Sequence, residues 1–264
     1  MKITALTSNC VDFFPEQDKV YVGGNSLNFA TQCKLSGINN VSVIGALGND
    51  RFGDLIEAHL DSCDIDRSHV YRMDLPTASN KIFINENGDR YFKEDSWDGG
   101  VFDVFRLFEN DWKYLENSDL IAMPAGDPNL NALLKRRNNK QTVAIDFLDY
   151  FTLPFIESKI EHIDLTFLSA NNEMLNELNA LAVKSDKMIV ATLGAEGSVA
   201  FWNNNSYFQK AVEVNEIVDT TGCGDAFQAA FAIEWLTSRD VEKALKMGSE
   251  AASKVLGFVS GVEK

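Results

Sequence analysis

Short apolar segments alternate with amphipathic segments along most of this chain, and that alternation constrains the fold more than any other feature. Helix-like stretches occupy Ser26–Ser36, closed by Gly37, and Asp54–Ser62, while an apolar stripe runs from Val241 to Val255 behind Asp240 as N-cap. Strands that alternate with helices predict βαβ units and a mainly parallel sheet. The strand candidates are Lys2–Thr7, Val41–Ile44, Leu120–Met123, Thr142–Asp146, Leu165–Leu168 and Met188–Thr192.

One region breaks this alternation. Ser79–Asn85 and Arg90–Lys93 are strand-like and flank Asn87-Gly88, a strong signal for a β-hairpin. Lys19–Val22 is a further strand candidate. We expect these segments to form a small second sheet, one face of which must be covered by substrate, by a partner subunit or by both.

Composition excludes several classes of protein. The chain has 264 residues, a formal net charge of −15 and a pI of about 4.6, which argues against binding to nucleic acid or anionic membranes. Four scattered cysteines without a Cys-x-x-Cys pair favour reduced thiols in a cytoplasm. The first residues read as a strand rather than a signal peptide, and no apolar run reaches membrane-spanning length.

The run from Asp219 to Phe227 carries the clearest chemistry. Gly222 and Gly224 free backbone amides to converge on one point, and a helix beginning near Asp225 adds a positive dipole end. Together they suit an anion. A carboxylate there would repel a resting anion, but it can accept the proton of a hydroxyl that attacks a phosphoryl group. The alternative is an ordinary helix N-cap after a glycine-rich turn.

Three other constellations each have a plain structural alternative. Asn25 and Asn28, after Gly23-Gly24, lie one helical turn apart and suit sugar hydroxyls, or one of them caps the helix. Asp12, just beyond the first strand, either accepts hydrogen bonds from ligand hydroxyls or is a solvated turn residue. Thr192-Leu193-Gly194-Ala195-Glu196-Gly197 allows a nucleotide close to the backbone, or makes a plain turn.

These motifs together resemble those of the PfkB (ribokinase-like) carbohydrate kinases from Asn9 to the last helix. The resemblance implies a ribokinase-like three-layer α/β/α sandwich over residues 1–264, with a β-sheet lid at about 13–23 and 76–98. It also implies phosphoryl transfer from ATP to a sugar hydroxyl, with Asp225 as general base and Gly222, Cys223 and Gly224 around it. By the same resemblance, the sugar meets Asp12, Gly24, Asn25 and Asn28, and the nucleotide meets Thr192, Gly194, Gly197 and Thr220.

Some family features match less closely. In Ser169-Ala170-Asn171-Asn172-Glu173 the spacing between asparagine and glutamate is shorter than in the family's Asn-x-x-Glu. Asn171 and Glu173 are the Mg²⁺ candidates by this resemblance, with Asp146 a further one, and a monovalent cation is compatible with the family. Gly48 and Asp50, in the family's Gly-x-x-Gly-x-Asp-x-x-Gly motif, are expected to shape the pocket. We also expect a lowered pKa for the Cys223 thiol at the helix start, or else an inert buried residue.

Within the family, the chain looks most similar to the fructoselysine 6-kinases, on Asn9–Asp12, Pro15 and Asp66-x-Ser68-His69-Val70. The predicted acceptor is therefore fructoselysine or a related fructosamine, phosphorylated at C6. A fructokinase, another ketose kinase, a nucleoside kinase or a non-catalytic sugar-binding regulator remain alternatives. Ile82, Ile84 and the lid aromatics predict a homodimer that forms through the lid.

Overall fold

The computed structural model describes residues 1–84, 90–91, 93–215, 217 and 219–257. In these residues a nine-stranded sheet has the order β15-β14-β13-β12-β11-β10-β1-β4-β5. Neighbouring strands of this sheet are parallel from β5 to β13. Strand β14 pairs antiparallel with β13, and β15 pairs antiparallel with β14. The strands are β1 (Lys2–Leu6), β4 (Asn40–Gly48), β5 (Asp66–Met73), β10 (Leu120–Pro124), β11 (Thr142–Asp146), β12 (Leu165–Ser169), β13 (Met188–Thr192), β14 (Ser198–Trp202) and β15 (Asn205–Gln209).

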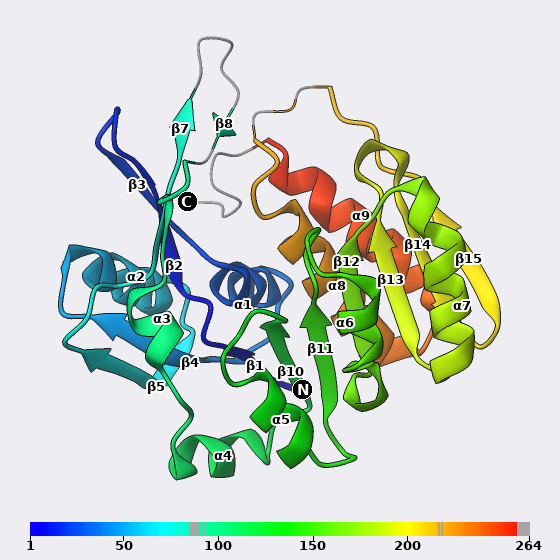
Figure 1. Cartoon of the computed structure of the whole chain (residues 1–264), viewed down its shortest axis with the longest axis horizontal. Helices are drawn as coiled ribbons and strands as arrows, with labels where there is room; N and C mark the ends of the chain where they lie inside the picture. The colour runs from blue at the N-terminus through cyan, green and yellow to red at the C-terminus, as the bar shows by residue number, and fades with distance from the viewer. Residues whose placement is uncertain (85–89, 92, 216, 218, 258–264) are drawn as a thin grey trace.

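Helices cover both faces of this sheet, which gives three layers (Figure 1). One apolar core lies under α1 (Asn25–Leu35), α2 (Arg51–Ser62), α8 (Cys223–Ser238) and α9 (Val241–Val255). The other lies under α3 (Gly100–Val104), α4 (Glu109–Leu115), α5 (Leu130–Arg136), α6 (Leu153–Glu157) and α7 (Leu175–Ser185). Short 3₁₀ turns η1 (Ile160–His162), η2 (Asn172–Met174) and η3 (Gly194–Glu196) complete the connections. The predicted α/β sandwich is confirmed.

The small second sheet has the order β3-β2-β6-β9, with β2 (Cys10–Phe14), β3 (Lys19–Gly23), β6 (Ser79–Lys81) and β9 (Trp97–Asp98). A separate pair, β7 (Phe83–Ile84) and β8 (Arg90–Tyr91), is antiparallel as the hairpin signal predicts, although Asn87 and Gly88 lie outside the described residues. In Figure 1, β3 and β7 extend upward on the left, away from the large sheet. We call residues 10–23 and 76–98 the lid. Its first segment starts three residues earlier than expected, because strand β2 belongs to the small sheet.

The predicted strands and helices in the large layers agree with the structure to within a few residues. Asp240 caps α9 by accepting a hydrogen bond from the Lys243 amide at 3.0 Å. One prediction was wrong in detail, because the expected strand Ser79–Asn85 is split between β6 and β7. The helix expected near Asp225 is α8, which begins at Cys223. The hairpin β14–β15 was not predicted, although its turn residues Asn203 and Asn204 have the positive φ that asparagine tolerates well.

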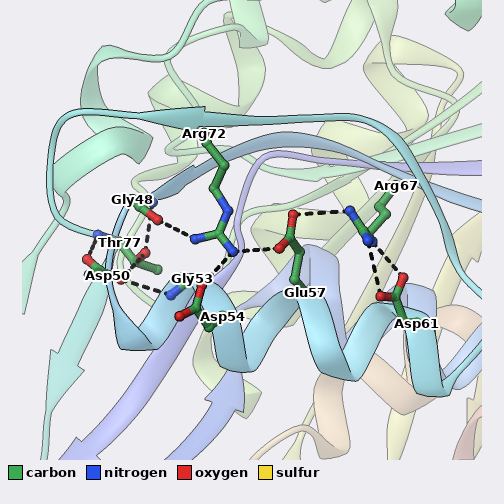
Figure 2. Close-up of polar contacts among 9 residues, drawn as sticks. All are labelled: Gly48, Asp50, Gly53, Asp54, Glu57, Asp61, Arg67, Arg72 and Thr77. Atoms are coloured by element: carbon green, nitrogen blue, oxygen red, sulfur yellow. Dashed lines mark hydrogen bonds and ion pairs between the residues drawn. The ribbon is translucent and has the colours of Figure 1, made fainter.

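The motif that contains Gly48 and Asp50 builds the joint between α2 and the lid (Figure 2). Asp50 caps α2 by accepting from the Gly53 amide at 2.8 Å. Its carboxylate also accepts from the amide and the hydroxyl of buried Thr77, each at 2.7 Å, and the Thr77 hydroxyl accepts from the Gly48 amide at 2.8 Å. Thr77 stands two residues before β6, so this joint fixes where the lid strand begins.

Candidate active site

A cavity of about 530 Å³ lies between the lid and the carboxyl ends of β1, β10 and β11, where open α/β sheets bind ligands. That volume is within the range of about 300–1,000 Å³ that is common for small-molecule sites. The described residues that line it are Ser8, Cys10, Asp12, Gly24, Asn25, Asn28, Asn80, Ile82, Trp97, Phe102, Asp103, Pro124, Gly126, Leu148, Tyr150, Thr221, Gly222 and Asp225.

Asp225 is the buried acid of this cavity and stands in the first turn of α8. The Asn28 side-chain amide donates to its Oδ2 at 2.9 Å, and the Asn25 amide donates to its Oδ1 at 3.3 Å. Burial raises the pKa of Asp225 to about 7, although the hydrogen bond from Asn28 alone would lower it. The nearby charge of Asp146 raises this pKa further. The carboxylate is therefore poised to take up or release a proton near neutral pH.

The backbone ahead of Asp225 is held in a tight turn. Asp219 Oδ1 accepts from the amide of Thr221 at 2.9 Å and from its hydroxyl at 2.8 Å. Gly222, the N-cap of α8, has φ +78°, which a residue with a Cβ adopts only with strain. An added Cβ at Gly224 would meet nothing within 4 Å, so the surface at this helix start is open. This arrangement suits an anion at the amides of α8.

Asp12 lies in strand β2 and is buried, so the alternative of a solvated turn residue is wrong. The β2 strand faces the cavity from the lid side, and the Asp12 charge contributes to the raised pKa of Asp225. Gly24, the N-cap of α1, has φ +100°, and a Cβ there would stand 2.4 Å from the Ser8 carbonyl oxygen. The structure thus brings Asp12, Gly24, Asn25, Asn28, Gly222 and Asp225 to one cavity.

The two asparagines do more than line the cavity. Asn25 also donates to Asp146 Oδ2 at 3.2 Å, so its amide group lies between two buried carboxylates. Burial raises the pKa of Asp146 as well. The Asn28 carbonyl oxygen is buried and has no hydrogen-bond partner among the described residues. Asn28 therefore holds Asp225 with the nitrogen end of its amide, and the oxygen end is left without a partner among the described residues.

The other predicted residues lie outside the described lining of the cavity: Thr192, Gly194, Gly197, Thr220, Cys223, Gly224, Asn171 and Glu173. Thr192 ends β13, and Gly194 opens η3 with free space beside its Cα. Gly197 has a structural reason of its own, because at φ +114° a Cβ would stand 2.1 Å from the Gln209 carbonyl oxygen. Gly248 is likewise needed for packing, since a Cβ would stand 2.8 Å from the Phe227 ring.

One expectation was wrong, and several other residues have structural roles that the sequence did not show. The pKa of the Cys223 thiol is raised to about 11 by burial and by Asp219 and Asp225, whereas the helix start predicted a lowered value. Gly48 and Asp50 fix the lid joint and do not line the cavity. Asn171 Oδ1 accepts from the amides of Glu173 and Met174, so it caps η2. The motif around His69 lies on edge strand β5, where His69 contacts Asp111 Oδ1 at 2.6 Å, also outside the lining.

Six of the eighteen described lining residues were predicted as site residues, so sequence reasoning missed two thirds of the lining. Pro124 and Gly126 follow β10, and Leu148 and Tyr150 follow β11, so the rule that ligands bind beyond strand ends could have found them. No comparable signal indicates Asn80, Trp97, Phe102 or Asp103. Asn80 and Trp97 reach the cavity on lid strands, whereas Phe102 and Asp103 reach it from α3, which packs on the large sheet.

Comparison with known protein families matches residues 5–261 to the "pfkB family carbohydrate kinase". The chain belongs to the PfkB family of carbohydrate kinases. This PfkB kinase is 28% identical to fructoselysine 6-kinase from Escherichia coli over 97% of both chains. It is 27% identical to fructosamine kinase FrlD from Bacillus subtilis, over 97% of this chain and 91% of that protein.

Solved structures show the same fold. Ribokinase from Thermotoga maritima superposes with a TM-score of 0.82 at 21% identity, over 99% of this chain and 94% of that one. Ribokinase from Arabidopsis thaliana, complexed with ribose and ATP, gives a TM-score of 0.82 at 19% identity, over 98% and 93% of the two chains. The predicted ribokinase-like fold and the carbohydrate kinase assignment are confirmed. Membership of this family also implies the use of ATP.

Proposed function

We propose that this PfkB kinase transfers the γ-phosphoryl group of ATP to the C6 hydroxyl of a fructosamine, with fructoselysine as the leading acceptor. The observation that carries the proposal is Asp225: a buried carboxylate on the cavity wall, at a helix start, held by two amide donors and with a pKa of about 7. The similarity to fructoselysine 6-kinase and fructosamine kinase FrlD supports the acceptor class.

In the proposed reaction Asp225 is the general base. The acceptor hydroxyl oxygen attacks the γ-phosphorus, the bond to the β-phosphate oxygen breaks, and the hydroxyl proton passes to Asp225. Asn25 and Asn28 orient the carboxylate, so one oxygen faces each amide. The amides at the start of α8, around Gly222, Cys223 and Gly224, would stabilise the charge on the transferred group.

The sugar would lie between Asp12, Gly24 and the free carbonyl oxygen of Asn28. A buried acceptor without a partner costs free energy unless a ligand satisfies it, and a sugar hydroxyl would do so. In this pose C6 points toward Asp225, while C1 and its amine-linked substituent point outward along the lid.

The nucleotide would extend from α8, just ahead of which Thr220 stands, toward Thr192 at the end of β13 and Gly194 and Gly197 around η3. Among the described residues no group of three or more His, Cys, Asp or Glu is arranged to hold a metal ion. Mg²⁺ does not require such a cage, because it commonly bridges substrate phosphates and one or two carboxylates. Glu173 fits that role better than Asn171, whose oxygen already caps η2. Bound Mg²⁺ would neutralise phosphate charge; a monovalent cation remains part of the proposal.

We also retain a homodimer that forms through the lid, and a cytoplasmic location. All four cysteines are free, and no helix in the described residues could span a membrane. Fewer apolar lid residues support the dimer than the sequence predicts. Ile82 is buried in this chain's own cavity wall, and the Phe83 and Tyr91 rings pack against each other with centroids 5.6 Å apart. A strictly monomeric mass by light scattering at micromolar concentration would refute it.

The test of the proposed function is Asp225→Asn, assayed by ADP release with fructoselysine, free fructose and a nucleoside. We expect turnover of fructoselysine to fall by about two or more orders of magnitude while both substrates still bind. Asp240→Asn is the matched control, since Asp240 also stands at a helix start but lies outside the cavity lining. Near-normal turnover by Asp225→Asn would remove Asp225 from the mechanism. A wild-type preference for free fructose or a nucleoside would refute the fructosamine assignment and leave the kinase intact.

A further inference from the structure

The charged side chains in the described lining of the cavity are all acidic. Its described lining contains three aspartates, Asp12, Asp103 and Asp225, and no Lys, Arg or His. An acceptor that already carries a phosphate would need a cation there, as phosphate sites commonly use Arg or Lys. The lining therefore suits a neutral or cationic acceptor and disfavours a sugar phosphate.

The Asp103 carboxylate differs from the other two in having no hydrogen-bond or ion-pair partner among the described residues. It is exposed on α3, whereas Asp12 and Asp225 are buried. No described residue donates a hydrogen bond to its carboxylate or forms an ion pair with it. The neighbouring cation, Arg106, donates instead to the main-chain carbonyl of Asp103 at 3.0 Å. A solvated carboxylate at the rim of a ligand cavity is available to a ligand cation.

Exposed aromatic rings line the same cavity as this carboxylate. Trp97 from β9 is 47% exposed and Tyr150 after β11 is 65% exposed, although both line the cavity. Phe102, next to Asp103, packs edge-on against Trp97 with ring centroids 5.9 Å apart. Aromatic faces and a carboxylate together form a favourable environment for an organic ammonium group.

Gly99 sets the position of the Asp103 carboxylate. A Cβ on Gly99 would stand 2.1 Å from Asp103 Oδ2, so the carboxylate lies directly over the Gly99 backbone. Gly99 itself has φ −72° and ψ −27°, which alanine adopts without strain. Gly99→Ala would thus displace the carboxylate while leaving the charge of the protein and the local backbone unchanged.

We propose that Asp103, which shares the cavity lining with Trp97 and Tyr150, binds the ammonium group that an amine-linked ketose carries at C1, and so selects fructosamines over free ketoses. This inference rests on the proposed function, because it requires the sugar to lie with C6 at Asp225. The amine attached to C1 is cationic at neutral pH, and it is the first charged group outward from the sugar ring. Asp103 is then a specificity residue and has no part in proton transfer.

The experiment compares two acceptors of nearly the same shape, N-propyl-fructosamine and 1-O-propyl-fructose, in which an ether oxygen replaces the amine. The wild-type enzyme is expected to prefer the amine in kcat/KM. Asp103→Asn should lower kcat/KM for the amine by about two- to fivefold, the range for a solvent-screened ion pair, and leave kcat/KM for the ether unchanged. Gly99→Ala should reduce the same preference. Asp95→Asn, an exposed lid aspartate outside the described cavity lining, should change neither acceptor.

A preference of the wild-type enzyme for the amine should also weaken as salt is raised, because exposed charges are screened. Equal loss for both acceptors in Asp103→Asn would mean a structural role and would overturn the inference, as would an unchanged preference. Phosphorylation of free fructose without turnover of either propylated acceptor would overturn the proposed function itself, and this inference with it.

Discussion

The joint between α2 and the lid gives a prediction whose size follows from its hydrogen bonds. Asp50→Ala removes the N-cap of α2, which costs about 1 kcal/mol. It also leaves the amide of Thr77 without its acceptor in a residue that is 1% exposed, which costs about 1–3 kcal/mol. The Thr77 hydroxyl can turn to another acceptor, so we add nothing for it. The expected loss in the free energy of unfolding is about 3 kcal/mol.

Asp50→Asn separates the two contributions. The Asp50 oxygen that serves Gly53 and the Thr77 hydroxyl is Oδ1, and the one that serves the Thr77 amide is Oδ2. Asparagine replaces one of them by an NH₂ group, which then faces an N–H donor whichever way the amide is turned. We expect a loss of about 1–2 kcal/mol, between the wild type and alanine.

Urea unfolding followed by far-UV circular dichroism measures these differences from the midpoint at constant m-value. Asp54→Ala is the control in the same helix turn (Figure 2), because Asp54 is exposed and its ion pair with Arg72 at 2.9 Å is expected to contribute little. Burial alone would raise the pKa of Asp50, but the hydrogen bonds from Thr77 and Gly53 lower it below its usual value. This stabilisation is therefore present at neutral pH and is lost as the pH falls below about 4.

The joint should also affect the acceptor side of the active site. Thr77 stands three residues before Asn80, which lines the cavity, while Asp225 lies on a different element. Asp50→Ala should thus raise KM for the sugar several-fold and change kcat little. A loss of stability below about 0.5 kcal/mol, the usual effect of a neutral surface change, would refute the reasoning for this joint.

Three further predictions follow from ionisable groups. Because Asp225 must be ionised to act as base and its pKa is about 7, kcat/KM should rise with pH between about 5 and 7 and then level off; a flat profile would exclude this base. Burial raises the pKa of Asp127 to about 7, so the folded state holds a proton that the unfolded state releases near pH 4. The free energy of unfolding should therefore fall as the pH rises from about 4 to 7. The melting temperature of Asp127→Asn should vary less between about pH 5 and 8 than that of the wild type. The Cys223 thiol, with a pKa of about 11, should react slowly with iodoacetamide at neutral pH and faster as the pH rises, whereas rapid labelling at pH 7 would restore the idea of an activated thiol.

The sequence alone determined the large layers of this protein, because they depend on local periodicity. Strands β10 to β13 are apolar runs buried on both faces, and α9 repeats apolar residues at the helical period, so each is recognisable without its neighbours. Asp225 was found for a related reason: its glycines, helix start and carboxylate are contiguous in the chain.

Tertiary structure decided how the polar groups of the site are shared. Asn25 and Asn28 meet Asp225 across about 200 residues of chain, and spacing alone could not show that their amides hold the base. The pKa of Cys223 followed burial and two nearby carboxylates rather than the helix start. Likewise, Trp97 reaches the cavity through strand pairing in the lid, and Asp103 reaches it because α3 packs on the large sheet. Desolvation and long-range contacts depend on which surfaces meet, and that information is not local to any segment of the sequence.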